Sequence, residues 1–185
     1  MPKARAGRKN HENLTFRLDA SLLESVRRDS ESEGFTLNSL ANRQFMQYTE
    51  WDRLESKIGF MTVRHRFFRA ILSKLSTDEI AAIGREQGPA EAREYMLLRW
   101  RTVTVENFLR FVENYARFAT QYQLEHHNHG EHVMILVHPL GEKWSIYLEA
   151  FMTAALENLF EIRAKTQRTD ESVALTFSTS NPIHG

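Results

Sequence analysis

The sequence predicts an α+β fold in two domains. A short alternating segment and two amphipathic helix patterns open the chain, and beyond residue 120 the apolar period changes from helical to strand-like. The chain has 185 residues, 42% of them hydrophobic and 26% charged, which is enough for one small domain and one of ordinary size. We expect a flexible basic arm over 1–11, a first domain over 12–56 and a second over 58–180.

Residues 13–18 alternate between polar and apolar side chains. The polar ones are Asn13, Thr15 and Arg17, and the apolar ones are Leu14, Phe16 and Leu18. An extended strand would bury the apolar set and present the hydrogen-bonding set on its other face. Polar residues on an exposed strand are also ordinary solvated residues, so this segment taken alone allows both interpretations.

Two helices are expected after the strand. Asp19 is positioned to cap the first helix, Gly34 to end it in a left-handed conformation, and Thr36 to cap the second. The apolar stripes contain Leu22, Leu23 and Val26 in the first helix and Leu37, Leu40, Ala41, Phe45, Met46 and Tyr48 in the second. One strand and two helices cannot enclose these stripes. A second copy of the chain is therefore predicted, its strand pairing antiparallel with the first in one ribbon.

This pattern resembles the ribbon-helix-helix superfamily of Arc-like and methionine-repressor-like proteins over the stretch NLTFRLDASLLESVRRDSESEGFTLNSLANRQFMQY. The resemblance implies a ribbon in the major groove of DNA that contacts bases through Asn13, Thr15 and Arg17. It also implies phosphate contacts at the start of the second helix, where free amides favour an anion. The residues there are Thr36, Leu37, Asn38 and Ser39. The implied function is that of a sequence-specific transcriptional regulator, such as a repressor, which binds double-stranded DNA as a homodimer or larger oligomer.

The formal net charge is zero, so affinity for DNA must come from local charge. The arm carries Lys3, Arg5, Arg8 and Lys9 immediately before the ribbon. These side chains would contact DNA phosphates or enter a minor groove. A solubilising tail is the alternative explanation of the same charges.

Several function classes find no support in the sequence. No apolar run is long enough to span a membrane, the N-terminus has no apolar signal core, and there is no cysteine. Nucleophile elbows, phosphate-binding glycine loops and HExxH signatures are also missing from the sequence. We therefore expect a protein that is not an enzyme, has no membrane partner, and lies in the cytoplasm on the nucleoid.

The second domain is expected to begin with one strand and several helices. Ser76 starts a capping signal, Gly88 is a stop signal, and Pro89 is suited to the first turn of a new helix. The expected elements are a strand over 58–64 and helices over 65–72, 76–88, 89–101 and 105–118.

A sheet is expected beyond residue 120. The elements are strands over 121–127, 132–138 and 172–177, a hairpin connection over 128–131 and a helix over 142–160. Residues 133–137 are continuously apolar, which is typical of a central strand covered on both faces. The order βα(αα)ββαβ suggests a ferredoxin-like sheet with inserted helices. In layout alone, the two domains resemble the nickel-responsive repressor, and the second would oligomerise the protein or sense an effector.

Five of the eight histidines lie between residues 126 and 138. His127, His129 and His132 are candidate metal ligands, with His127 expected opposite His132 in the hairpin. A metal-responsive repressor is one interpretation, and ordinary turn chemistry at Asn128-His129-Gly130 is the other. No other cofactor is expected.

A strand-to-helix turn containing His138, Gly141 and Trp144 is a second candidate ligand site. Gly141 allows an unusual backbone angle, the first helical amides favour an anion, and Trp144 would form an apolar wall. In the alternative, the turn only ends the strand and Trp144 anchors the helix to the sheet.

Two other functions are compatible with a DNA-binding ribbon. An architectural, nucleoid-associated protein would bind many sites and bridge them through the second domain. An antitoxin is less well supported, because its toxin-binding tail is usually short and disordered, whereas a folded domain is expected here.

Overall fold

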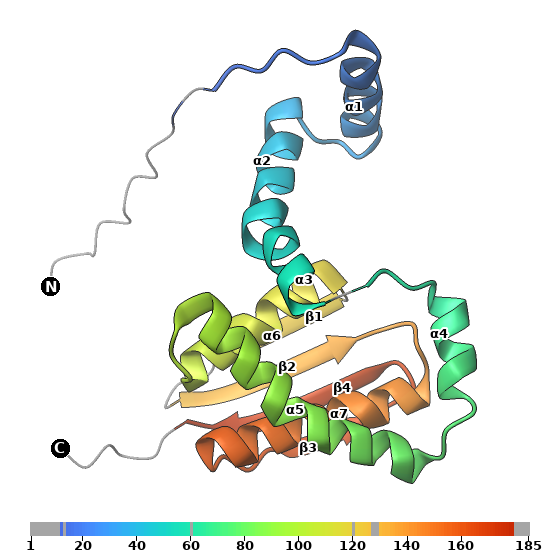
Figure 1. Ribbon diagram of the computed structural model, residues 1–185, viewed down its shortest axis with the longest axis vertical. Coiled ribbons are helices and arrows are strands. Elements are labelled where there is room, and N and C mark those ends of the chain that lie inside the picture. The colour runs from blue at the N-terminus through green and yellow to red at the C-terminus, as the bar shows by residue number, and fades with distance from the viewer. Residues whose placement is uncertain (1–11, 13, 60, 120, 127–129, 180–185) are drawn as a thin grey trace, which may run out of the picture. The chain divides into compact units, whose positions relative to one another are not determined.

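The computed structural model describes residues 12, 14–59, 61–119, 121–126 and 130–179. The chain forms two compact units, an N-terminal unit (Met1–Met46) and a C-terminal unit (Gln47–Gly185). Helices and an antiparallel sheet are both present, so the predicted α+β class is confirmed (Figure 1).

The described part of the N-terminal unit contains two helices, α1 (Ala20–Ser32) and α2 (Leu37–Gln47). As predicted, Asp19 caps α1, because its carboxylate accepts the backbone N–H of Ser21 at 2.9 Å. A hydrogen bond from the Ser21 hydroxyl, together with this backbone hydrogen bond, lowers the pKa of Asp19.

The predicted turn between the two helices is also confirmed. Gly34 has a φ of +71°, and its N–H donates to the carbonyl oxygen of Glu31 at 3.1 Å. This left-handed residue ends α1, as glycine commonly does at helix C-termini. Thr36 then caps α2 by accepting the backbone N–H of Ser39 at 3.1 Å.

Residues 14–19 form neither helix nor strand in the single chain. Their apolar members Leu14, Phe16 and Leu18 are 74%, 53% and 50% exposed. A strand needs a neighbour to complete its hydrogen bonds, and the expected neighbour belongs to a second copy. The paired ribbon thus stays a prediction.

The first half of the C-terminal unit is helical. It contains the π-helix η1 (Tyr48–Asp52), α3 (Arg53–Ile58) and α4 (His65–Leu72). The helix predicted over 65–72 is confirmed, but the strand predicted over 58–64 is wrong. Trp51 and Leu54 are buried three residues apart, so the helical period continues to Ile58, and residues 61–64 form no strand.

The next helix, α5 (Thr77–Trp100), is longer than predicted. Ser76 caps it as expected: its hydroxyl accepts the N–H of Glu79 at 3.2 Å, and the Glu79 carboxylate accepts the N–H of Ser76 at 2.7 Å. The predicted break at Gly88 and Pro89 is wrong, because the helix continues through both residues. Packing against another helix overrides the local stop signal here.

Two further helices and four strands complete the part of this unit that the structure describes. They are α6 (Val105–Ala119), β1 (Gln121–His126), β2 (Glu131–Val137), α7 (Glu142–Phe160), β3 (Lys165–Arg168) and β4 (Ser172–Ser178). The described strands form one antiparallel sheet in the order β1-β2-β4-β3. The predicted hairpin is confirmed. The ferredoxin-like order is not found, since the expected first strand is missing and β3, a polar edge strand, was not predicted.

The sheet is covered by helices on one face. Its buried side chains are Met134 and Leu136 of β2 and Val173, Leu175 and Phe177 of β4. The alternate residues of β2 are less buried, and Val137 is 36% exposed. The prediction that β2 is covered on both faces is therefore wrong. Rings of α6 and α7 pack together behind the buried face, including Phe108 on Phe160 at 5.7 Å.

None of the helices in the described part of the chain is long and apolar enough to cross a membrane.

Candidate nucleic-acid interface

The helices of the N-terminal unit are capped, but almost none of its described side chains are buried. Among its described residues, Ser30 alone is buried. Its large exposed apolar side chains are Leu14, Phe16, Leu18, Leu22, Phe35, Phe45 and Met46, each at least 45% exposed. Isolated units of this size need a core or a partner to be stable. This unit lacks the core.

A hollow of about 910 Å³, part of it open to solvent, lies between the two helices and the segment that precedes them. Its apolar lining consists of Leu18, Leu23, Val26, Leu37, Leu40 and Ala41. These residues include part of each stripe predicted to face a second copy, whereas Leu22, Phe45 and Met46 lie outside the lining. Phe16 and Phe45 stack near it with their ring centroids 5.6 Å apart.

Arg43 connects the two helices of this unit. Its guanidinium forms an ion pair with Glu33 at 2.9 Å and lies 4.9 Å above the ring of Phe35. Sequence reasoning missed this residue, because ten positions separate it from Glu33 and no local signal links them. The contact joins the end of α1 to the middle of α2, and thereby stabilises the turn that positions the start of α2.

The predicted base-contacting residues lie in the exposed segment before α1. Thr15 and Arg17 are exposed there, whereas Asn13 lies outside the described residues. The arm residues Lys3, Arg5, Arg8 and Lys9 also lie outside them.

The predicted phosphate-contacting residues form the start of α2. Thr36, Asn38 and Ser39 are exposed, while Leu37 is partly buried at the hollow. The hydroxyls of Thr36 and Ser39 lie 2.9 Å apart. Because Thr36 already satisfies the N–H of Ser39, the first amides of the helix are the groups left to bind an anion.

The predicted metal site is not assembled in the described part of the chain. The strand register pairs His132 with His126, not with His127 as expected. His132 contacts Thr179, with Nε2 and Oγ1 3.1 Å apart, and its ring packs on Phe177. His127 and His129 lie outside the described residues, and no three potential ligand side chains converge within them.

His138, the first residue of the second candidate site, is only 3% exposed. Its Nδ1 accepts the N–H of Leu140 at 3.3 Å, so the proton lies on Nε2, which donates to the Ser145 hydroxyl at 2.9 Å. Burial lowers the pKa of His138 to about 4. It is therefore neutral at pH 7 and links the end of β2 to α7.

Gly141 and Trp144 flank the start of α7. Gly141 has a φ of +84° and precedes the helix, and it lines a shallow hollow near Arg69. Trp144 is 9% exposed and packs against Phe68 at 5.3 Å and Tyr147 at 4.5 Å. Neither His138 nor Trp144 lines that hollow, so the three candidates do not surround one space. No protein-family model, curated protein or solved structure matches this chain.

Proposed function

We propose that this protein is a sequence-specific DNA-binding transcriptional regulator that acts as a dimer or higher oligomer, in the cytoplasm on the nucleoid. One observation carries the proposal. The N-terminal unit has two correctly capped helices and an alternating segment, yet leaves its apolar side chains exposed. A unit whose helix ends are capped but whose apolar side chains are exposed is suited to symmetric association with a second copy of itself.

A second copy explains the alternation at 14–18. Antiparallel pairing of two such segments would bury Leu14, Phe16 and Leu18 over the hollow and complete the backbone hydrogen bonds. The same pairing would leave Thr15 and Arg17 on the outer face of a two-stranded ribbon. A ribbon of this width enters the major groove, where Arg pairs with guanine and Asn with adenine.

Phosphate contacts would set the register on DNA. The start of α2 offers exposed amides and the hydroxyls of Thr36 and Ser39. Zero net charge means that these contacts and the basic arm must supply the electrostatic part of the affinity.

A genome-wide binding map of the tagged, full-length protein tests the proposal. Discrete sites with palindromic half-sites support a regulator, since a two-fold protein reads a two-fold sequence. Broad, even coverage would instead identify an architectural protein. Affinities for one mapped site and for a scrambled site, measured at one stated salt concentration, then give the specificity ratio. A ratio near one would contradict sequence-specific regulation.

A further inference from the structure

Residues 56–77 form the longest stretch of the sequence without an acidic residue. Basic and acidic residues are equal in number over the whole chain, yet this stretch carries five basic residues. They are Lys57, Arg64, Arg66, Arg69 and Lys74. Where charges of one sign gather, the local surface attracts a polyanion even when the net charge of the chain is zero.

Helix α4 lies in the middle of this stretch and is anchored to the C-terminal unit through one side. Leu72 is 8% exposed, and Phe68, one turn earlier, packs on Trp144 with the ring centroids 5.3 Å apart. Just after the helix, Nζ of Lys143 donates to the carbonyl oxygen of Ser73 at 3.0 Å. The packing and this hydrogen bond fix α4 against α7.

The basic side chains of α4 lie away from the packed side. Because successive helical residues turn by about 100°, Arg66 and Arg69 are about 60° apart and both lie at least about 100° from Phe68. Arg64 directly precedes the helix, and Lys74 follows it closely. All four side chains are exposed, and no acidic residue lies in the first turn of the helix.

These charges are not neutralised by the chain itself. Five other arginines of the C-terminal unit form ion pairs with carboxylates, namely Arg99, Arg110, Arg117, Arg163 and Arg168. None of the five basic residues of 56–77 forms an ion pair with a residue that the structure describes. One acid, Glu142, lines the hollow beside α4, but it does so together with Arg69 and Lys143. Positive charge therefore prevails on this surface.

We propose that the outer face of α4, with Arg66 and Arg69 at its centre and Arg64 and Lys74 at its ends, binds the phosphate backbone of double-stranded DNA without reading its sequence. Guanidinium groups donate in a planar fork to phosphate oxygens, and each phosphate contact releases condensed counterions. The choice of DNA among polyanions rests on the proposed function. This face would add affinity for any sequence to the selectivity of the ribbon.

An anionic lipid bilayer fits this face less well. A helix that lies on a bilayer inserts large apolar side chains, with its basic side chains on the polar face beside them. The exposed apolar side chains of α4 are Phe67 and Ile71, and each lies at least about 100° around the helix from Arg66 and from Arg69. The basic face thus presents charge and hydrogen-bond donors without a large apolar group to insert.

The salt dependence of binding to a scrambled duplex tests the proposal on the full-length protein. Fluorescence anisotropy at several potassium chloride concentrations gives the association constant, whose logarithm falls linearly with the logarithm of the salt concentration. Each lost phosphate contact makes this slope shallower by about 0.9, so Arg66→Gln combined with Arg69→Gln should make it shallower by about 1.8.

Two matched pairs of substitutions serve as controls. Arg66→Lys combined with Arg69→Lys keeps both charges and should keep the wild-type slope. Arg85→Gln combined with Arg93→Gln removes the same charge from exposed positions of α5, outside the acid-free stretch, and should also leave the slope unchanged. Thermal unfolding by circular dichroism shows whether each variant is folded.

A wild-type slope in the glutamine pair of α4, or an equal change of slope in both glutamine pairs, would overturn the proposal. An unchanged slope together with lost binding to vesicles of phosphatidylcholine and phosphatidylserine would instead assign the face to a membrane.

The two proposals can fail separately. A specificity ratio near one, with a shallower slope in the glutamine pair of α4, would reject sequence-specific regulation and keep this contact. An unchanged slope, with specificity lost in Arg17→Ala, would reject this contact alone.

Discussion

Gly88 of α5 lies directly against the backbone of Phe151 in α7: a Cβ added at Gly88 would be 2.2 Å from the carbonyl oxygen of Phe151. Gly84, one turn earlier, lies almost as close to Tyr147, whose carbonyl oxygen would be 2.6 Å from an added Cβ. Two glycines four residues apart thus allow the helices to cross almost backbone to backbone. The crossing also brings Glu91 of α5 next to the rings of α7.

Gly88→Ala should destabilise the C-terminal unit by about 2 kcal/mol or more, because the helices must separate to admit the methyl group. Alanine favours a helix over glycine by only about 1 kcal/mol, so the clash outweighs this gain. Urea unfolding followed by circular dichroism measures the change. Ala90→Gly, at an exposed position of the same helix, is the control and should cost only about 1 kcal/mol. Wild-type stability of Gly88→Ala would show that the crossing is wrong.

The buried His138 should make stability depend on pH. Its pKa is about 4 in the folded protein against about 6.5 in the unfolded chain, so between these values the unfolded chain binds a proton that the folded chain does not. Stability is therefore full above pH 6.5 and falls as the pH approaches 4, by at most about 3 kcal/mol.

Urea midpoints at several pH values measure this dependence. His138→Asn should be less stable than the wild type at pH 7.5, because it loses the link to Ser145, but should show a flatter decline below pH 6.5. His65→Asn, at an exposed position, is the control and should keep the wild-type slope. An unchanged slope in His138→Asn would mean that other groups cause the decline.

Arg17→Ala should cost roughly 1 to 3 kcal/mol of specific DNA binding and leave the fold intact, because one bidentate contact to guanine is lost while the exposed side chain supports no packing. Fluorescence anisotropy with a mapped site and a scrambled site measures it. Arg28→Ala removes an exposed arginine of α1 that pairs with Glu24, and should preserve the specificity ratio. Full retention of operator affinity by Arg17→Ala would refute the role of this residue.

Leu14→Glu should weaken dimerisation about a hundredfold, because it adds a charge to the face that the second copy would bury. Analytical ultracentrifugation over a concentration series gives the dissociation constant. Thr15→Glu introduces the same charge one residue later, on the opposite strand face, and should keep the dimer while abolishing DNA binding. Equal dimerisation of both variants would argue against the ribbon.

Local hydrogen bonds explain which elements were predictable. Asp19, Gly34, Thr36 and Ser76 act on amides and carbonyls a few residues away, so their positions mark the helix ends wherever the helices pack. The strand expected over 58–64 failed because a short apolar run has no such marker. Its pattern fits a helix as well as a strand.

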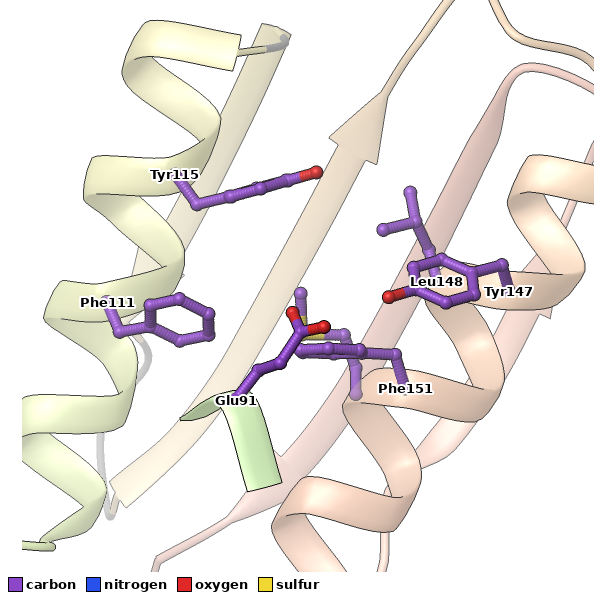
Figure 2. Close-up of a pocket in the computed structure, with 7 residues that line it drawn as sticks. Glu91, Phe111, Tyr115, Tyr147, Leu148 and Phe151 are labelled. Carbon is purple, nitrogen blue, oxygen red and sulfur yellow. The ribbon is translucent and has the colours of Figure 1, made fainter. Parts of the chain in front are cut away.

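A pocket beside Glu91, between α5, α6 and α7, could be predicted only weakly from the sequence (Figure 2). Phe111 and Tyr115, and likewise Tyr147 and Phe151, are four residues apart and share a helix face. Such spacing is also that of an ordinary core, and nothing in the sequence links these pairs to Glu91. Only the crossing of α5 and α7 brings the carboxylate to the rings.

By itself, the sequence determined the α+β class, the helix ends marked by Asp19, Gly34, Thr36 and Ser76, and the hairpin between β1 and β2, because each depends on neighbours along the chain. The tertiary structure decided the rest. Three features depend on contacts between distant segments: α5 continues through Gly88 and Pro89, the polar residues 165–168 form an edge strand, and Glu91 lies beside aromatic rings of α6 and α7. Such contacts outweigh local preferences when they bury enough surface, and no short stretch of sequence records them.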